Sequence, residues 1–251
     1  MIPRISIVTV CFNAAATIGR TLDSVAMQQG VEYEHLVVDG GSRDETMTVV
    51  DQHRHDQLSA VSEPDRGIYD AMNKGVARAR GDYLLFLNAD DYLARPDSLK
   101  LAADALAETE ADCLFADTQF VGPDGTTAGQ RRYSARRFAR WWLRVGAQPP
   151  HPSMLLRRSL VEELGGYDTS FRIAGDFDLV ARALLGRRAS FATLPVVLTH
   201  FQVGGVSTAG MGAKLALNRE LAQSLRGLGQ PFHRVAVLLR LPLKLLQYRP
   251  A

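Results

Sequence analysis

Cysteine and long apolar runs are scarce in this sequence of 251 residues. Only Cys11 and Cys113 occur, and their spacing matches neither a metal site nor a disulfide framework. We therefore expect a reduced, cytoplasmic protein. No uninterrupted apolar run is long enough to span a bilayer, and a strand pattern begins near the N-terminus with no signal peptide before it.

Acidic residues are missing from two long stretches, although the formal net charge is only +2. The stretch from Gly125 to Val161 contains eight arginines and no acid, and no acid follows Glu220. The small net charge argues against a protein that binds nucleic acid in general. The positive charge is instead concentrated locally.

The first predicted strand, Ile5–Val10, is not followed by the Gly-x-Gly-x-x-Gly turn of dinucleotide-binding folds. The segment Cys11–Ala14 follows it instead. The usual glycine cradle for a pyrophosphate is therefore absent, which argues against a Rossmann-type oxidoreductase. The glycine- and arginine-rich loop of nucleotidyltransferases is absent from the same position.

Strand and helix patterns alternate over the first half of the chain, and apolar residues make up 46% of the sequence. This alternation predicts an α/β fold with a mostly parallel central sheet flanked by helices. The predicted strands are Ile5–Val10, His35–Asp39, Leu58–Ser62, Tyr83–Leu87 and Cys113–Ala116.

The pattern changes after Ala116. The later elements are a hairpin over Gln119–Thr127, a basic helix over Ser134–Arg144, a strand over Ser153–Leu156, helices over Ser159–Leu164 and Asp176–Leu185, strands over Ser190–Leu194 and Val196–His200, and two final helical stretches.

Acidic residues follow the ends of the predicted strands. Because parallel strands end at one edge of a sheet, Asp39, Asp65, Asp90 and Asp91 are expected along a single rim, where open α/β sheets bind ligands. Four acids would repel a diphosphate unless a divalent cation intervened. Mg²⁺ or Mn²⁺, held by one or two carboxylates and by phosphate oxygens, fits this need. The alternative is a solvated strand end at which Asp91 caps a turn.

Several ordered motifs cover the first ninety residues densely and resume later in the chain. Together they resemble the nucleotide-sugar-dependent family 2 glycosyltransferases, which have the GT-A fold. The subgroup that looks most similar builds bacterial exopolysaccharide and includes colanic-acid-type enzymes. The motifs are Val8–Asn13, Val37–Thr46, Ser62–Gly75, Leu87–Asp91, His151–Ser153 and Ala174–Leu179.

The resemblance implies a nucleotide site in the first half of the chain. Asp39 would accept a hydrogen bond from the nucleobase, and Thr9 and Asn13 would line the same pocket. Asp65 and Arg66 would lie beside the base or the phosphates.

The resemblance also implies a metal site. Asp90 would contact the ribose or the donor sugar, and Asp91 would hold Mn²⁺ or Mg²⁺ on the diphosphate as the last acid of an Asp-x-Asp-type motif. Asn88, a weaker ligand, stands in the first position of that motif. His200 is a further candidate metal ligand, although a lone histidine is more often structural.

The second half would supply the acceptor site and the base. Asp176 resembles the catalytic base of the family, although an acid at a helix start can also be a simple N-cap. Many members have Glu before this Asp, whereas Gly175 stands here. Asp178 is a backup base or a support for Asp176, and His151 resembles an acceptor-side histidine.

These assignments predict an inverting glycosyltransferase of surface polysaccharide biosynthesis. It would move a sugar from a nucleoside-diphosphate donor, with UDP-sugar favoured, to a saccharide or lipid-linked saccharide acceptor. Residues 1–117 would bind the nucleotide-sugar, residues 118–205 would bind the acceptor, and residues 206–251 would form a helical segment. The alternative is a catalytically silent nucleotide-sugar-binding or scaffold protein of the same fold.

The two basic stretches suggest partners for the protein. The predicted basic helix, whose arginines alternate with aromatic residues, suits a membrane interface or a lid over the donor diphosphate. The segment His233–Arg249 is also basic and apolar. It suits the anionic cytoplasmic face of an inner membrane, or else packing on the domain or on a second subunit in a homo-oligomer.

Overall fold

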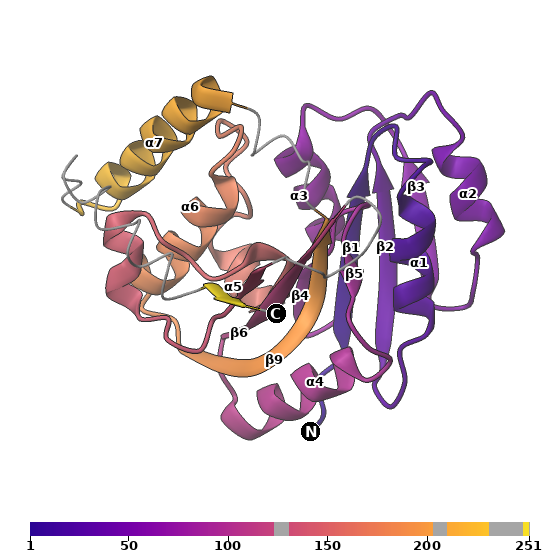
Figure 1. Cartoon of the computed structure of the whole chain (residues 1–251), viewed down its shortest axis with the longest axis horizontal. Coiled ribbons are helices and arrows are strands. Elements are labelled where there is room, and N and C mark those ends of the chain that lie inside the picture. The colour runs from indigo at the N-terminus through magenta and orange to yellow at the C-terminus, as the bar shows by residue number, and fades with distance from the viewer. Residues whose placement is uncertain (123–130, 203–209, 231–247, 251) are drawn as a thin grey trace.

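The computed structural model describes residues 1–122, 131–202, 210–230 and 248–250 of the chain. Helices lie on both sides of a curled central sheet (Figure 1). The strands are β1 (Ile5–Cys11), β2 (Tyr33–Asp39), β3 (Leu58–Ser62), β4 (Tyr83–Phe86), β5 (Tyr92–Leu93), β6 (Cys113–Val121), β7 (Arg131–Tyr133), β8 (Met154–Arg157), β9 (Phe191–Gln202) and β10 (Tyr248–Pro250). The helices are α1 (Ile18–Ala26), α2 (Thr46–Gln52), α3 (Ile68–Arg78), α4 (Ser98–Thr109), α5 (Arg158–Glu163), α6 (Gly175–Ala181) and α7 (Gly210–Gly227), with short turns η1 (Arg140–Val145), η2 (His151–Ser153) and η3 (Arg182–Gly186).

The first half of the sheet is parallel, in the order β4-β1-β2-β3. Every residue of β1 is buried, because α3 covers one face of the sheet while α1 and α2 cover the other. Val8 and Val10 pack with Met72 of α3, whereas Cys11 packs with Leu22 of α1. The carboxyl ends of these strands therefore share one rim, as predicted.

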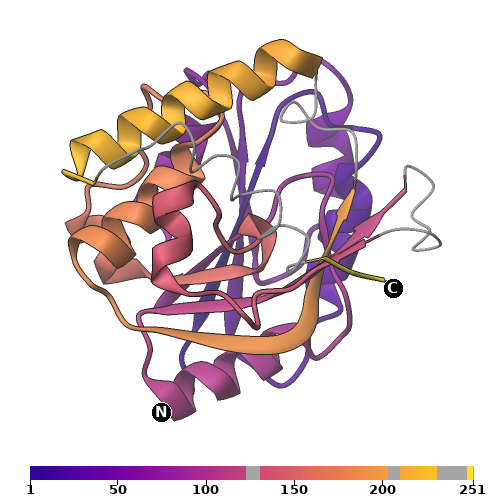
Figure 2. The ribbon, with the colours of Figure 1, turned by 60° about the vertical axis from the view of Figure 1, so that its left-hand side comes forward.

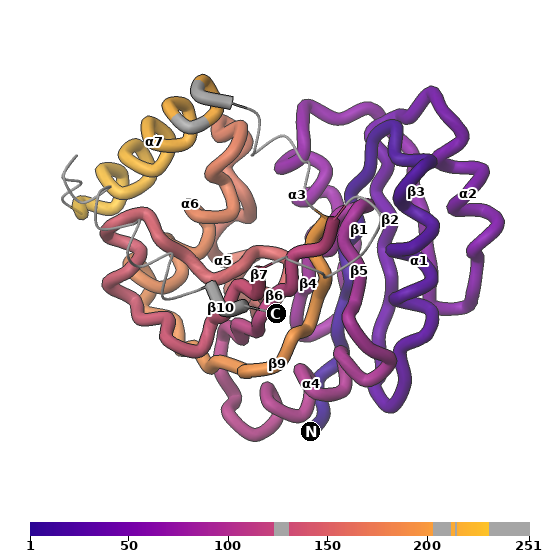
Figure 3. The backbone as a smooth tube through the Cα atoms, in the orientation of Figure 1, coloured from indigo at the N-terminus to yellow at the C-terminus, as the bar shows by residue number. Residues whose placement is uncertain are grey.

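The second half of the sheet introduces antiparallel pairs. Strand β8 lies antiparallel between β4 and β6, β7 is antiparallel to β6, and β5 is antiparallel to β9. The predicted α/β fold is confirmed, but the sheet is mixed, and its parallel character is confined to the first four strands and the β6–β9 pair. Strand β9 bends along the sheet to reach β5, where the rim begins (Figure 3).

Two predicted elements differ from the structure. The segments Ser190–Leu194 and Val196–His200 form one strand, β9, which continues through Pro195 with a shift of register against β6. The predicted basic helix Ser134–Arg144 is wrong: only the 3₁₀ turn η1 forms, and Phe138 and Trp142 are buried in the core. The predicted hairpin arm at residues 126–127 lies outside the described residues.

Helix α7 packs against the second half of the molecule (Figure 2). Leu221 and Leu225 of α7 belong to the same buried cluster as Phe177 and Val180 of α6. Most of His233–Arg249 lies outside the described residues. Among the helices that the structure describes, none is both long and apolar enough to cross a membrane.

Candidate active site

The turn after β4 carries the acid pair. The backbone N–H of Asp91 donates to the carbonyl of Asn88 at 3.0 Å, and the hydroxyl of Thr21 in α1 donates to the carbonyl of Asp91 at 2.7 Å. The Asp91 side chain is 0% exposed. Its Oδ1 accepts from the backbone N–H of Gln202 at 3.3 Å, whereas its Oδ2 has no hydrogen-bond partner among the described residues.

Burial raises the pKa of Asp91 well above its usual range, and the nearby Asp90 raises it further. The pKa of Asp90 is itself raised by burial. An ionised carboxylate in such a place is costly unless a cation or a donor group meets it. The Oδ1 of Asn88 is a second buried oxygen without a partner in the described part of the chain. Carboxylate and amide oxygens are hard ligands, so these two residues fit a divalent cation.

His200 lies next to this turn on β9. Its backbone pairs with Tyr92, and its ring packs edge-on against the Tyr92 ring with centroids 4.8 Å apart. Burial lowers the pKa of His200, and its Nδ1 has no hydrogen-bond partner among the described residues. A neutral imidazole is the form that binds metals. In the described ranges, however, no group of three or more His, Cys, Asp or Glu side chains is placed to hold a metal ion.

Asp39, at the end of β2, is surrounded by donors. Its carboxylate accepts from the backbone N–H of Gly41 at 3.1 Å and of Ser42 at 2.9 Å, from both serine hydroxyls at positions 42 and 62, and from the Cys11 thiol at 3.6 Å. Burial would raise the pKa of Asp39, but these hydrogen bonds outweigh burial and lower it. Asp39 is therefore ionised, and it fixes the loop after β2.

Thr9 lies in β1 beside Val37 of β2, and its predicted place in the nucleotide pocket stays a prediction. Its side chain is 0% exposed, and its hydroxyl is 2.9 Å from Nε2 of His35, inside the core. Burial lowers the pKa of His35 to about 3, so this pair is neutral. Asn13, by contrast, is exposed and adopts a φ of 51°. Its Oδ1 accepts from the backbone N–H of Arg43, so Asn13 joins the loops after β1 and β2.

Asp65 and Arg66 lie in the loop between β3 and α3. Asp65 accepts from the backbone N–H of Gly67 at 2.8 Å, and its other oxygen lies against Gly40, where any side chain would overlap it. Asp65 therefore belongs to the Asp39 side of the rim. The Arg66 side chain is 83% exposed and pairs with Asp70 at 3.1 Å. Such an exposed pair contributes little to stability, so Arg66 can move toward a ligand.

Asp176 lies in the first turn of α6. Its Oδ2 accepts from Nε2 of Gln148 at 2.6 Å, and its Oδ1 accepts from the backbone N–H of Phe177 at 2.8 Å. The bond from Gln148 was not predicted, because the two residues lie 28 positions apart in the sequence and in different elements. Gln148 holds one carboxylate oxygen of Asp176 in a fixed direction.

An aromatic cluster adjoins Asp176. The rings of Tyr69 and Tyr167 are stacked with centroids 5.4 Å apart, and Phe86 of β4 packs edge-on against Tyr167 at 5.1 Å. Nε2 of His151 is 3.3 Å from the Tyr167 hydroxyl. Burial raises the pKa of both tyrosines, and the Asp176 charge raises it further. Because Phe86 precedes the Asn88 turn by two residues, this cluster links the acid pair to Asp176.

His151 stands between opposing influences. Burial lowers its pKa, while the negative charge of Asp176 acts in the opposite direction. The imidazole is stacked on Phe86 with centroids 6.1 Å apart. His151 is therefore held near Asp176, and its predicted role on the acceptor side stays a prediction. Tyr69 and Tyr167 were missed as site residues, although Tyr69 lies within the motif Ser62–Gly75.

Tyr69 also explains why glycine precedes Asp176. A Cβ at Gly175 would lie 2.6 Å from Cε2 of Tyr69. The Tyr69 ring therefore fills the space of a side chain at this position.

Replacing Gly175 by Ala should lower the free energy of unfolding by about 1–3 kcal/mol, because the Tyr69 ring is wedged against the new methyl group. Urea unfolding measures this change. Gly212→Ala in α7 is the matched control, because a Cβ there meets nothing within 4 Å. Equal stabilities for the two variants would contradict the tight contact.

Asp178 has structural contacts, and its predicted role as a backup base or as a support for Asp176 stays a prediction. Nε of Arg182 donates to its Oδ2 at 2.6 Å, and the hydroxyl of Ser224 in α7 donates to its Oδ1 at 2.7 Å. Both carboxylate oxygens of Asp178 are therefore hydrogen-bonded on the side of α6 that faces α7. Asp178 ties the two helices together.

Glu220 of α7 holds the loop that leads into α6. Its carboxylate accepts backbone N–H groups from Arg172 at 3.1 Å, Ile173 at 2.9 Å and Ala174 at 2.8 Å. Ala174 is two residues before Asp176. Glu220 therefore positions the start of α6 without touching Asp176 itself.

Glu220→Ala should reduce kcat by about 10- to 100-fold, because the start of α6 loses its anchor and Asp176 is misplaced. The KM for the donor should stay unchanged. Glu220→Gln should retain part of the activity, since one oxygen still accepts. Ser224→Ala, which loosens the same helix pair elsewhere, is the control. A kcat equal to that of the wild type in folded Glu220→Ala would exclude this positioning role.

The sequence matches the model of the family described as Glycosyl transferase family 2 over residues 6–165. An uncharacterized glycosyltransferase of Mycobacterium tuberculosis is 35% identical over 211 residues, which cover 82% of this chain and 78% of the relative. A PGL/p-HBAD biosynthesis glycosyltransferase of Mycobacterium bovis is 31% identical over 210 residues, with 82% and 79% covered.

Two solved structures are similar in fold. Residues 1–349 of Staphylococcus aureus TarS in complex with UDP-GlcNAc superimpose with a TM-score of 0.69 at 21% identity, over 88% of this chain and 66% of that one. The chain thus spans about two thirds of that structure. The mannosyltransferase PcManGT of Pyrobaculum calidifontis, in complex with GDP-Man and Mn²⁺, has a TM-score of 0.63 at 21% identity, over 99% and 81%. With the family match covering more than half of its length, this chain belongs to the family 2 glycosyltransferases and has the GT-A fold.

Proposed function

We propose that the protein is an inverting glycosyltransferase that takes a sugar from a nucleoside-diphosphate donor. A UDP-sugar is the favoured donor, and a saccharide or lipid-linked saccharide is the acceptor. The observation that carries this proposal is a pair of acids linked by one aromatic cluster. Asp91 is a buried carboxylate with one oxygen that has no hydrogen-bond partner among the described residues. Asp176 is a carboxylate held in place by Gln148.

The donor diphosphate lies at the Asn88–Asp91 turn in this proposal. Asp91 holds Mn²⁺ or Mg²⁺, with Asn88 as a weaker ligand, and His200 offers its unpartnered Nδ1. When bound, the ion neutralises charge on the departing diphosphate. Asp90 contacts the ribose or the sugar. Arg66 is exposed and close to this rim, so it can add positive charge at the phosphates.

The nucleobase lies against the loop that Asp39 fixes. A base N–H can take the place of one serine hydroxyl on the Asp39 carboxylate, which stays ionised because hydrogen bonds lower its pKa. Asn13 and Asp65 border the same loop. Thr9, which was predicted to line the same pocket, is buried in β1.

Asp176 acts as the general base. Its carboxylate removes the proton of the acceptor hydroxyl while that oxygen bonds to the anomeric carbon of the sugar. The bond from the anomeric carbon to the phosphate oxygen breaks, and the nucleoside diphosphate leaves with the electron pair. Attack from the face opposite the leaving group inverts the anomeric centre. His151 and the Tyr167 hydroxyl are placed to hold acceptor hydroxyl groups.

Surface polysaccharide biosynthesis is the proposed process. The M. bovis relative is named for PGL/p-HBAD biosynthesis, and a chondroitin synthase of Pasteurella multocida is 29% identical over 181 residues. A cytoplasmic location, with contact to a membrane or a second subunit, fits such a role. The alternative is a silent nucleotide-sugar-binding protein, which would need the Asp91 side of the site but not Asp176.

The test is a thermal-shift screen of UDP, GDP and dTDP, each with and without Mn²⁺, followed by transfer assays with the corresponding sugars. A ligand that binds only the folded protein raises its stability by mass action, by about 2.7 kcal/mol at a concentration of 100 Kd. We expect a shift with one nucleotide and a larger shift with Mn²⁺. No shift with any of them would refute the donor site.

A further inference from the structure

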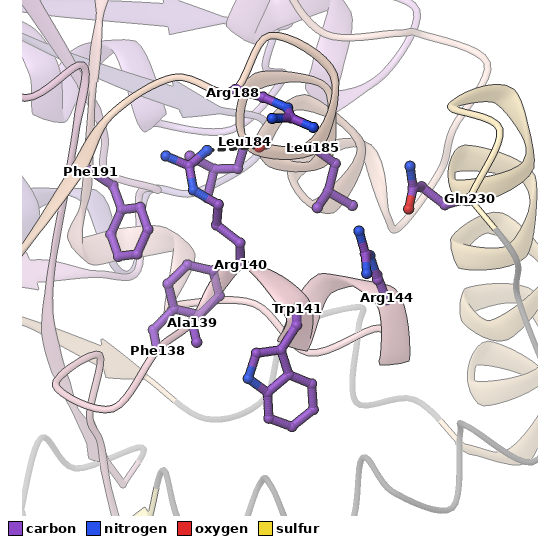
Figure 4. Close-up of a pocket in the computed structure, with 10 residues that line it drawn as sticks. All are labelled: Phe138, Ala139, Arg140, Trp141, Arg144, Leu184, Leu185, Arg188, Phe191 and Gln230. Carbon is purple, nitrogen blue, oxygen red and sulfur yellow. Dashed lines mark hydrogen bonds between the residues drawn. The ribbon is translucent and has the colours of Figure 1, made fainter.

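A pocket of about 730 Å³ lies away from the acid pair, between η1, η3 and Gln230, three residues after α7 (Figure 4). Its volume is that of a site for one small molecule. Leu184 and Leu185 of η3 contribute to its lining. Because η3 continues α6, Leu185 lies nine positions after Asp176, about two helical turns along this segment. The pocket is therefore separate from the proposed transfer site, on the half of the molecule that carries Asp176.

Three arginines line this pocket. Arg140 is anchored, because its Nη1 donates to the carbonyl of Leu184 at 2.9 Å and its guanidinium lies 5.4 Å from the Phe191 ring centroid. Figure 4 shows Arg188 on the other side of Leu184 and Arg144 close to Leu185. Within the described part of the chain, neither the Arg144 nor the Arg188 side chain forms an ion pair or a hydrogen bond.

The chain itself offers no obvious anion for these two arginines. None of the residues that line the pocket is acidic. The segment of residues 231–247, which directly follows Gln230 at the pocket, contains arginine and lysine but no acid. An external anion is the complementary partner.

The apolar part of the pocket restricts the anion further. Leu185 and Phe191, which are half-buried, form a lining suited to hydrocarbon, while the Trp141 side chain on η1 is exposed and points away from the guanidinium groups. Tryptophan with one apolar and one polar end favours the boundary between lipid headgroups and water. Guanidinium groups bind phosphate in bidentate fashion.

We propose that this pocket binds one anionic phospholipid and so docks the enzyme on a bilayer. Arg144 and Arg188 hold the phosphate, the apolar lining receives the first part of an acyl chain, and Trp141 enters the headgroup region. The proposed function supplies the purpose of this contact, which is to present Asp176 to an acceptor at a membrane. The binding test needs neither donor nor acceptor, so its failure would leave the transfer assignment untouched.

The test is flotation of the full chain with vesicles at physiological ionic strength. One set is pure phosphatidylcholine, and the other is an equimolar mixture of phosphatidylcholine and phosphatidylglycerol. The wild type should float only with the mixed vesicles. Arg144→Gln combined with Arg188→Gln should bind them about 10- to 30-fold more weakly, since each cation near an anionic surface contributes substantially to affinity.

Arg136→Gln combined with Arg137→Gln is the matched control. Both residues are exposed on the same basic stretch, outside the pocket lining, and the charge change is identical. This variant should stay within about 3-fold of the wild type, because its lost charges act only through the diffuse surface field. Trp141→Ala should weaken binding without any change of charge. Equal losses in the two arginine variants, or binding by the pocket variant that matches the wild type, would overturn the proposal.

Sedimentation without vesicles tests whether a second copy of the chain occupies the pocket instead. The pocket variant should have the same oligomeric state as the wild type. If it instead dissociated while vesicle binding stayed unchanged, a second copy of the chain would be the occupant and the lipid proposal would be wrong.

Discussion

Asp176→Asn should abolish sugar transfer and leave the donor bound. General-base catalysis typically contributes about 10²- to 10⁴-fold to a rate, and asparagine cannot accept the acceptor's proton. The amide is nearly the same size, and it can still accept the backbone N–H of Phe177 that meets Asp176. We therefore expect kcat to fall by that factor, while the Kd for the nucleotide with Mn²⁺ changes by less than about 2-fold. Nucleotide release and calorimetric titration measure the two quantities.

Asp168→Asn is the control for this substitution. Asp168 is exposed in the loop before α6, and its Oδ1 accepts from the backbone N–H of Ser170. The chemical change is identical and the neighbourhood is shared, so kcat should stay near that of the wild type. Turnover of Asp176→Asn at the wild-type rate would mean that Asp176 only caps its helix. The silent-protein alternative instead requires that neither the wild type nor the variant transfers sugar.

Asp91→Asn should remove the stabilisation of the protein by a nucleotide with Mn²⁺. In the wild type that stabilisation reaches about 2.7 kcal/mol at a ligand concentration of 100 Kd, and its loss should be accompanied by loss of transfer. The physical reason is that Asp91 is fully buried, with an oxygen that meets no partner in the described residues. Asp104→Asn, in an exposed pair with Lys100 on α4, is the matched control.

The pH dependence of stability, measured without nucleotide or metal, is a second and independent test of Asp91. Its pKa in the folded state is raised, so protonation favours the folded form. Stability is then fully present below the pKa of the unfolded carboxyl, about 3.9, and is lost as pH rises through the higher folded pKa. Asp91→Asn should lack this loss and be at least as stable as the wild type at pH 7 without metal. Chemical unfolding at a series of pH values measures this difference in stability. A marked destabilisation of the metal-free variant would contradict the conclusion that Asp91 has a buried oxygen without a partner.

The acids could be predicted from the sequence because each follows a local pattern. Asp39 and the pair Asp90–Asp91 come directly after apolar strands, and Asp176 comes at the start of an amphipathic helix. Parallel strands bring such ends to one edge whatever the details of packing. The order of the motifs then indicates the family, which the match over residues 6–165 confirms.

Long-range contacts could not be predicted from local patterns. Gln148 meets Asp176, Tyr69 meets the loop before α6, and Glu220 meets the same loop over 46 to 48 positions. Such contacts depend on how α3, α6 and α7 pack, and no local periodicity encodes that packing. The role of Gly175 likewise becomes clear only when the Tyr69 ring lies against it.

The remaining differences between the predictions and the structure have physical reasons as well. Thr9 was predicted to line a ligand pocket. Because β1 is buried along its whole length, alternation of apolar and polar residues does not tell which face of the sheet Thr9 takes. The basic stretch Ser134–Arg144 has the spacing of an amphipathic helix. In the structure Phe138 and Trp142 are buried in the core, and only the 3₁₀ turn η1 forms. Asp178 was predicted as a backup base or a support for Asp176, and no local pattern indicates that it bonds to Arg182 and Ser224.

The most direct test of the two-sided site is a crystal structure with UDP and Mn²⁺, in which anomalous scattering locates the ion. We predict one manganese ion within about 2.0–2.3 Å of an Asp91 oxygen, bridging to the diphosphate, with the nucleobase against the Asp39 loop. The end of the bound diphosphate that carries the sugar in the donor should point toward Asp176. An ion or nucleotide bound elsewhere, with Asp91 still buried and without a metal, would contradict the proposed site.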